Sequence, residues 1–123
     1  MERIRTYRLR NRNKYGNKKC KIDGFTFDSI KEGGRYAELK ILLREGLIKD
    51  LELQKQFELQ PGFIDADGKR IRPIYYRADF CYTDTETGKM VVEDVKSAAT
   101  KTAVYQLKKK MMAYKGITIK EIE

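Results

Sequence analysis

Two aspartates and a lysine stand inside two stretches that are otherwise rich in the residues of β-strands. Asp79 lies in the first stretch, YYRADFCY, while Asp94 and Lys96 lie in the second, MVVEDVK, and the turn-like segment TDTETG separates the two. Charged groups are costly to bury in a strand unless they are paired or bind a metal. Because side chains two apart share a face of a strand, we expect Asp94 and Lys96 on one side, with Asp79 beside them on the neighbouring strand of a hairpin.

Two carboxylates and a lysine in this arrangement suit metal-assisted chemistry on a phosphate group. Oxygen ligands favour a hard cation such as Mg²⁺, which retains several waters. The cation would bind phosphate oxygens, generate a hydroxide nucleophile and stabilise the charge that develops on phosphorus. Lys96 would position the attacking water or neutralise that charge. The structural alternative is an Asp94–Lys96 ion pair on a surface strand, which contributes about 0–1 kcal/mol.

The composition narrows the chemistry that is open to this chain. The sequence has no histidine, which excludes Ser/His/Asp and Cys/His catalysis and histidine zinc sites. Its two cysteines, Cys20 and Cys81, lack CxxC spacing, so we expect a thiol in the N-terminal segment and a second in the core, although a bridge between them stays open. An enzyme with this sequence depends on carboxylates, Lys, Tyr or a metal ion.

Positive charge is concentrated at the N-terminus. Residues 1–21 hold nine of the 27 Lys and Arg residues against one acid, Glu2, while the net charge of the whole chain is +9. A basic arm on a nearly neutral domain is typical of a segment that binds nucleic-acid phosphate, and a solubilising or membrane-surface tail is the alternative. The residues of the arm that we expect to contact DNA are Arg3, Arg5, Arg8, Arg10, Arg12, Lys18 and Lys19.

The chain has no sequence feature of a membrane or secreted protein. No apolar run approaches the roughly 18 residues that span a bilayer, and the first ten residues, MERIRTYRLR, lack the apolar stretch of a signal peptide. We therefore expect a cytoplasmic protein without membrane contact. Its length predicts a single domain over residues 22–123 that follows the basic arm, residues 1–21.

The pattern of residues predicts a mixed α/β domain with one sheet and helices packed against it. Residues 27–46 are expected to hold a helix, with Ser29 as N-cap, Glu32 in a capping-box position and Gly46 at the end. Strands are expected at about 50–59, 71–83 and 89–96, followed by a helix over 102–115 and a final strand in ITIKEI. The expected order is α-β-β-β-α-β.

Several side-chain orientations follow from this assignment. On the second helix, Val104, Leu107 and Met111 are expected to face inward, and Tyr105 and Lys108 are candidates to touch phosphate, although a solvated face is the alternative for both. On the third strand, Glu93 alternates with Asp94 and is expected to point outward, unless the register shifts by one residue.

The ordered set of motifs resembles the PD-(D/E)XK nuclease superfamily. In that pattern a helix bearing a glutamate precedes an aspartate on one strand and a (D/E)-x-K motif on the next. This chain offers Glu32 in the helix, Asp79 in RADF and Asp94-Val95-Lys96 in EDVKS, although the residue before Asp79 is Ala78 rather than proline. More narrowly, residues 22–122 resemble a small phage and prophage protein family of unknown function that has been grouped with these nucleases.

The resemblance implies a restriction-endonuclease-like core and a metal-dependent endonuclease. Asp79, Asp94 and Glu32 would hold Mg²⁺ or Mn²⁺, and Lys96 would complete the catalytic set. Glu32 can equally serve only as a capping residue, while Glu38 lies about 240° from it around the helix and is expected in solvent.

The expected substrate is DNA with a structural feature such as a junction, a flap or an end, in phage replication or recombination. A homodimer would cut both strands, and phage or host recombination proteins are candidate partners. A non-catalytic nucleic-acid-binding protein on a nuclease-like scaffold is the main alternative, and a structural phage component is a weaker one.

Overall fold

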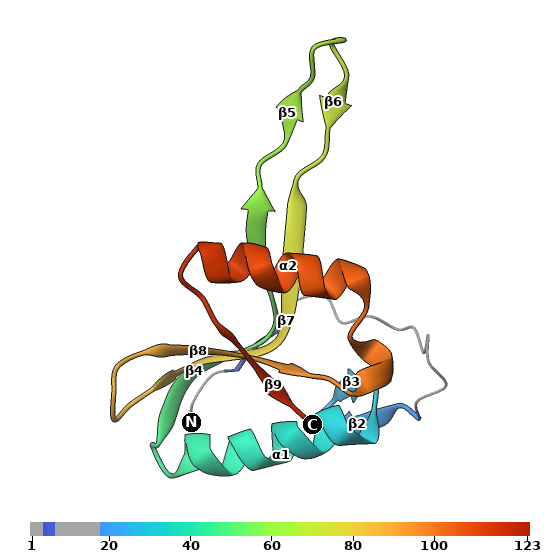
Figure 1. Cartoon of the computed structure of the whole chain (residues 1–123). Coiled ribbons are helices and arrows are strands. Elements are labelled where there is room, and N and C mark those ends of the chain that lie inside the picture. Colours follow the sequence, from blue (N-terminus) through green and yellow to red (C-terminus); the bar gives the residue numbers. More distant parts are fainter. Residues whose placement is uncertain (1–3, 7–17) are drawn as a thin grey trace.

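The computed structural model describes residues 4–6 and 18–123, and within them a five-stranded mixed sheet lies between two helices (Figure 1). The strand order is β1-β4-β7-β8-β9. The three central strands are antiparallel, and the outer strands β1 and β9 run parallel to their neighbours. The described elements are β1 (Arg5–Thr6), β2 (Cys20–Ile22), β3 (Phe25–Phe27), α1 (Ile30–Arg44), β4 (Ile48–Gln60), β5 (Phe63–Ile64), β6 (Arg70–Ile71), β7 (Ile74–Asp84), β8 (Met90–Val95), a 3₁₀ turn (Ala98–Thr100), α2 (Ala103–Tyr114) and β9 (Ile119–Ile122).

The mixed α+β architecture predicted from the sequence is confirmed, with two helices against one mixed sheet. The main elements follow in the expected order α1, β4, β7, β8, α2 and β9. Two short hairpins are added to this order. The first, β2–β3, packs beside α1, and the second, β5–β6, extends the β4–β7 pair beyond the helical layers (Figure 1).

Helix α1 begins and ends as its sequence predicts. The Ser29 hydroxyl accepts a hydrogen bond from the Glu32 backbone N–H at 3.0 Å, and Gly46 takes a φ of 78° just after the helix. Tyr36 and Leu39 are buried against the sheet. Gly33 is needed for close packing, because a Cβ at this position would lie 2.7 Å from the Cys20 Sγ on β2.

The central β4–β7 strand pair changes layer along its length: one face of the pair packs against α1 in one part and against α2 in the other. Residues two apart on a strand share a face, yet Leu53 packs in the core beside α1 while Leu59 packs in the core beside α2. On β7, Phe80 and Ala78 divide between the two cores in the same way. The change occurs at Gln54, whose φ of 56° is unusual for a non-glycine residue.

One predicted strand is interrupted. The expected strand 71–83 is divided into β6, which ends at Ile71, and β7, which begins at Ile74. Pro73 lies between them and has no N–H for a continuous ladder, which explains the break. The strand predicted at 89–96 ends at Val95, so Lys96 follows the strand directly.

The inward face predicted for α2 is confirmed at Met111, which is half-buried against the core beside this helix, and is wrong at Val104 and Leu107. Val104 and Leu107 are about 60% exposed, whereas Tyr105 and Met112 are buried against the sheet. The helix begins after Thr102, whose hydroxyl accepts the Tyr105 backbone N–H at 3.1 Å, and packing against the sheet places Tyr105 and Met112 on its buried face. Tyr105 and Met112, rather than the smaller aliphatic residues Val104 and Leu107, therefore fill the core beside α2.

The outward orientation predicted for Glu93 is also wrong. Its side chain is fully buried on the α1 side of β8, where Arg35 donates to it from Nε at 2.8 Å and from Nη2 at 2.6 Å. The Tyr82 hydroxyl donates to the same carboxylate. Both faces of β8 are covered, so alternation along the strand places Glu93 and Asp94 in two different interiors.

The described part of the basic arm touches the sheet edge. Arg5–Thr6 form β1, which pairs with Glu52–Leu53 of β4, and Ile4 packs against the core beside α1. Lys18 and Lys19 are exposed just before β2. The other predicted DNA-contacting arginines, Arg3, Arg8, Arg10 and Arg12, lie outside the described residues. Among the described residues, no helix is long and apolar enough to cross a membrane.

The buried Arg35–Glu93 pair yields a stability prediction. Arg35→Met leaves Glu93 buried without its cation, so we expect the free energy of unfolding to fall by about 3–5 kcal/mol in urea denaturation. Glu38→Gln is the matched control, because Glu38 accepts from the same guanidinium at 2.9 Å but is mainly exposed, and it should cost about 0.5 kcal/mol or less. Equal losses in the two variants would contradict this role for the pair.

Candidate active site

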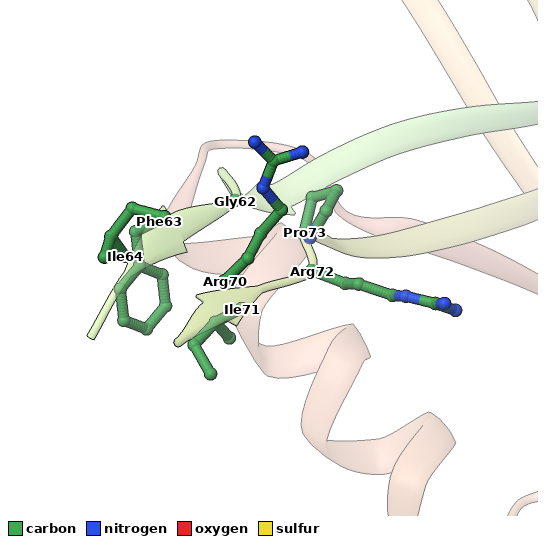
Figure 2. A pocket seen from close by; sticks show the side chains of 7 residues that line it. All are labelled: Gly62, Phe63, Ile64, Arg70, Ile71, Arg72 and Pro73. Atoms are coloured by element: carbon green, nitrogen blue, oxygen red, sulfur yellow. The ribbon is translucent and has the colours of Figure 1, made fainter. Parts of the chain in front are cut away.

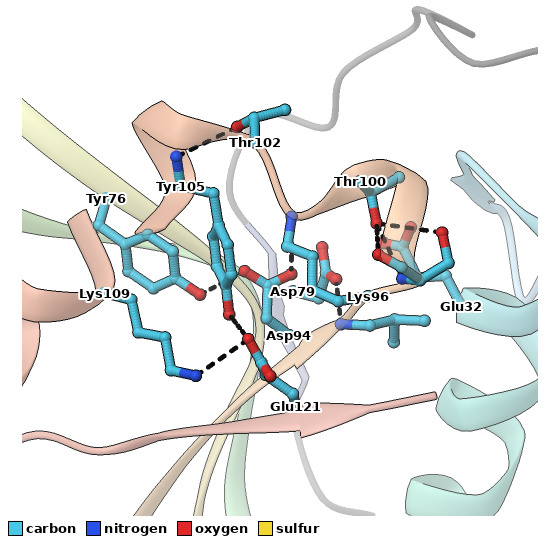
Figure 3. A network of polar contacts seen from close by, with 12 residues as sticks. Glu32, Tyr76, Asp79, Asp94, Lys96, Thr100, Thr102, Tyr105, Lys109 and Glu121 are labelled. Atoms are coloured by element: carbon cyan, nitrogen blue, oxygen red, sulfur yellow. Dashed lines mark hydrogen bonds and ion pairs between the residues drawn. The ribbon is translucent and has the colours of Figure 1, made fainter. Parts of the chain in front are cut away.

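Asp79 of β7 and Asp94 of β8 meet between the two strands, as the hairpin register predicts (Figure 3). The strands pair Phe80 with Glu93, which puts the two aspartates next to each other in the ladder. The Asp79 Oδ2 accepts the Val95 backbone N–H at 2.8 Å. Asp94 is almost fully buried and accepts a hydrogen bond from the Tyr76 hydroxyl. The pair is therefore held in place from both strands.

Gln54 connects this pair to the helical glutamate. It lies opposite Asp79 on β4, at the point where the hairpin changes layer. Its Nε2 lies 3.3 Å from the Asp79 Oδ1 and 3.3 Å from the Glu32 Oε1, and its side chain is buried. The amide thus donates to a carboxylate from α1 and to a carboxylate from β7 at once.

Lys96 is the nearby cation of the cluster. Its Nζ lies 3.7 Å from the Asp94 Oδ1 and 4.4 Å from the centre of the Tyr105 ring. About a fifth of the Lys96 side chain is exposed, so the side chain lies between the carboxyl groups of the site and solvent. The predicted proximity of Asp94 and Lys96 on one face is confirmed.

The carboxyl groups at the site have raised pKa values and therefore ionise less readily than in water. Burial raises the pKa of Glu32 to about 9, and the negative charges of Asp79 and Asp28 add to the rise. Burial is also the largest cause of the raised pKa of Asp79, followed by its proximity to Asp94, and burial likewise raises the pKa of Asp94. Lys96 opposes the shift at all three carboxylates without cancelling it. The site therefore holds more carboxyl groups than its local positive charge can balance.

Helix α2 forms one wall of the site. The buried Tyr105 hydroxyl donates to the Glu121 Oε2 of β9 at 2.7 Å, and Lys109 lies 3.1 Å from the same oxygen (Figure 3). Lys101 lies 3.3 Å from the other Glu121 oxygen. Three hydrogen-bond donors keep the pKa of Glu121 low, at about 2, with Tyr105 the largest cause. Glu121 is thus an ionised support for Tyr105.

The structure brings together four of the site residues predicted from the sequence, namely Glu32, Asp79, Asp94 and Lys96. Tyr105 lies in the wall of this site, with its ring against Lys96, and Lys108 lies on the partly exposed side of α2. Glu38 points to solvent as predicted, with its side chain 67% exposed. The predicted contacts of Tyr105 and Lys108 with phosphate stay predictions.

Sequence reasoning missed Gln54 and Tyr76. Gln54 was not separable from Gln56 in the run LQKQF, because its role depends on the pairing of β4 with β7 and on the change of layer. Tyr76 resembles any other aromatic core residue in sequence. The available signal was that Tyr76 occurs on the same strand as Asp79, next to the strand of Asp94, and that Gln54 occurs on the predicted strand preceding that of Asp79.

Oxygen donors that could hold a divalent cation come from three elements. Asp79 and Asp94 are adjacent, and Glu32 is linked to Asp79 through Gln54. Within residues 4–6 and 18–123, no three acidic or cysteine side chains are already gathered at the spacing of a complete metal-ligand set. A cation at this position would therefore use the two aspartates first, with Glu32 next to them.

One comparison with known proteins gave a match. Residues 12–122 match the model of a family described as "Protein of unknown function (DUF1064)", and the chain belongs to this family. Searches of curated proteins and of solved structures gave no match.

The raised pKa of Glu32 yields a pH prediction. The folded protein keeps a proton on Glu32 up to about pH 9, whereas the unfolded chain releases it near the ordinary value of 4.5. The free energy of unfolding should therefore fall as pH rises from about 4.5 to 9, with one group contributing at most about 1.4 kcal/mol per pH unit. Glu32→Gln removes this contribution, so its thermal unfolding in EDTA should depend less on pH than that of the wild type. Glu38→Gln is the exposed control and should retain the wild-type slope. An unchanged slope in Glu32→Gln would contradict the assignment.

Proposed function

We propose that this protein is a metal-dependent endonuclease that hydrolyses DNA phosphodiesters. The observation that carries the proposal is the convergence of Asp79, Asp94 and Lys96 at one point between β7 and β8, where α1 also contributes Glu32. These residue types, in this chain order, are those that carry the resemblance to the PD-(D/E)XK nucleases. The likeness of the sheet and helices to a restriction-endonuclease core is part of the same proposal.

The donor set suits Mg²⁺ or Mn²⁺. Carboxylate oxygens are the ligands that these hard cations prefer, and the crowded carboxyl groups with raised pKa values leave negative charge to be balanced once they ionise. Asp79 and Asp94 would hold the ion, with Glu32 beside them. When bound, the ion supplies charge stabilisation at a phosphate oxygen and lowers the pKa of a bound water.

The other side chains at the site have separate roles in this proposal. The Lys96 ammonium lies near Asp94 and close to solvent, where it can orient an attacking water or neutralise charge on the phosphate. The Tyr76 hydroxyl orients the Asp94 carboxylate. Gln54 fixes Asp79 and Glu32 relative to each other and is a positioning residue, because its amide contacts both carboxylates.

The charge distribution supports DNA as the substrate. The basic residues of the arm, including Lys18 and Lys19, and Lys108 on α2 would neutralise phosphates. Cleavage of both strands would use two sites, so we propose a homodimer as the acting form. A role in phage DNA replication or recombination, with phage or host recombination proteins as partners, rests only on the resemblance.

One observation favours a second candidate function. The carboxylates at the site already have internal partners, because Asp79 accepts from Val95 and Gln54, and Asp94 pairs with Lys96 and Tyr76. A non-catalytic nucleic-acid-binding protein would need no more than these contacts. Under that alternative, divalent ions would change neither DNA affinity nor protein stability.

A cleavage assay separates the two functions. Purified protein is incubated with labelled duplex, single-stranded and four-way-junction DNA in Mg²⁺, Mn²⁺ or EDTA. We expect cutting that requires a divalent ion and disappears in Asp94→Asn and Lys96→Ala, while DNA affinity stays within about twofold, because these side chains act on the reacting phosphate. Glu38→Gln serves as an acidic control on the same helix as Glu32 and should cut normally.

The same assay measures the role of Gln54. Gln54→Asn keeps an amide and a residue that tolerates positive φ, but its shorter side chain cannot bridge both carboxylates. We expect the cleavage rate to fall by about 10–100-fold with wild-type circular dichroism and wild-type DNA affinity. Binding of DNA by all proteins, with no cutting in either metal, would instead establish the non-catalytic alternative.

A further inference from the structure

The β5–β6 hairpin projects beyond the two helical layers (Figure 1). It continues the β4–β7 strand pair, and its residues are absent from both hydrophobic cores of the described structure. Even so, it carries large apolar side chains: Phe63 is 46% exposed and Ile64 is 60% exposed. Burial of apolar surface is the main force that stabilises folded chains, so exposed apolar side chains gathered on a projecting ribbon indicate a binding surface.

The hairpin encloses a shallow apolar hollow with cationic edges. The hollow has a volume of about 330 Å³ and is lined by both strands of the hairpin. Phe63 pairs with Ile71 across the ladder, and Figure 2 shows their side chains on one side of the ribbon with Arg70 on the other. Unpaired nucleic-acid bases stack on exposed aromatic rings, and cations elsewhere on the same ribbon can neutralise the phosphates that flank the stacked base.

Charge favours a polyanion over a second copy of this chain on this surface. Three cations, Lys69, Arg70 and Arg72, occur within four residues, and the outer side of the nearby helix α2 carries further lysines. Two acids also lie in the turn, but the Asp65 carboxylate accepts the backbone N–H groups of Asp67 and Lys69 and so holds the turn. A second hairpin or a second α2 placed on the ribbon would bring like charges together, whereas DNA would not.

The hairpin has a fixed reach from the candidate active site. Gln54 lies on β4 opposite Asp79 of β7, and Phe63 of β5 follows Gln54 by nine residues along the same strand pair. At about 3.3 Å per residue this separation is about 30 Å. That length corresponds to about nine nucleotides along one strand of B-form DNA.

We propose that the β5–β6 hairpin binds unpaired bases of the DNA substrate, about nine nucleotides from the cleaved phosphate, with Phe63 as the stacking residue. The hairpin then selects branched DNA, such as a flap or a junction, over continuous duplex, because a paired and stacked base has no free face for Phe63. This inference rests on the proposed nuclease function and specifies its substrate class.

Binding measurements with the full-length chain test the hairpin separately from catalysis. Fluorescence anisotropy in EDTA compares a continuous duplex, a flap and a four-way junction of equal length. We expect wild-type protein to prefer branched DNA, and Phe63→Ala to lose about tenfold affinity for it while changing duplex affinity by less than twofold. Phe63→Leu should lose part of the preference. Ile41→Ala, a substitution of a similarly exposed residue on α1, should have no effect.

Two further experiments test the position of the bound base and the contribution of the hairpin's positive charge. An abasic site placed about nine nucleotides from the cut should remove the difference between wild-type protein and Phe63→Ala, while abasic sites in other positions should not. Arg70→Gln should weaken binding to all three DNAs and reduce the slope of log affinity against log salt by about one.

The outcomes distinguish the hairpin from the nuclease. If wild-type protein cuts DNA and Phe63→Ala keeps the same preference for branched DNA, the hairpin inference is wrong and the nuclease proposal stands. If Phe63→Ala instead converts a dimer to a monomer in sedimentation, the surface joins two copies of the chain and the inference is wrong. Wild-type protein that binds no DNA would overturn both proposals.

Discussion

The carboxyl group of Asp79, half-buried between β7 and β8, is the constraint on which the rest of the site depends. An uncompensated charge that is largely shielded from water is costly, so each oxygen of this carboxyl group needs a donor. Val95 supplies one from the backbone of β8, and Gln54 supplies the other from β4. These two contacts join three strands around a single side chain. Burial, followed by the charge of the adjacent Asp94, raises the pKa of Asp79, and burial raises the pKa of Asp94, so neither aspartate ionises readily without a compensating cation.

The change of layer at Gln54 explains how both helices reach this point. Before it, β4 packs against α1, and beyond it the same face packs against α2. The N-terminus of α1 therefore contributes Glu32, while the first turn of α2 contributes Tyr105 beside Lys96. The unusual backbone conformation of Gln54 is retained where its side chain meets two carboxylates. Backbone strain of this kind is common at functional sites.

The sequence predicted elements with strong local signals and failed where tertiary contacts decide. The helix cap at Ser29, the hairpin between Asp79 and Asp94 and the order of the main elements follow from local residue patterns. The orientation of Glu93 could not be predicted in this way, because its partner Arg35 lies 58 residues away. The face of α2 was misassigned because Val104 and Leu107 fit a core stripe equally well in sequence. Gln54 was missed because its role depends on hydrogen bonds to Glu32 of α1 and Asp79 of β7, which are distant in sequence.

Calorimetric titration of Mn²⁺ into the wild-type chain tests most directly whether this carboxylate cluster is a cation site. Measured at pH 7 in two buffers with different ionisation enthalpies, the heats report both binding and proton release. We expect saturable binding with release of protons, because carboxyl groups with raised pKa values must ionise to bind the ion, and we expect both signals to be lost in Asp79→Asn. Absence of Mn²⁺ binding, or binding without proton release that Asp79→Asn leaves unchanged, would contradict this expectation.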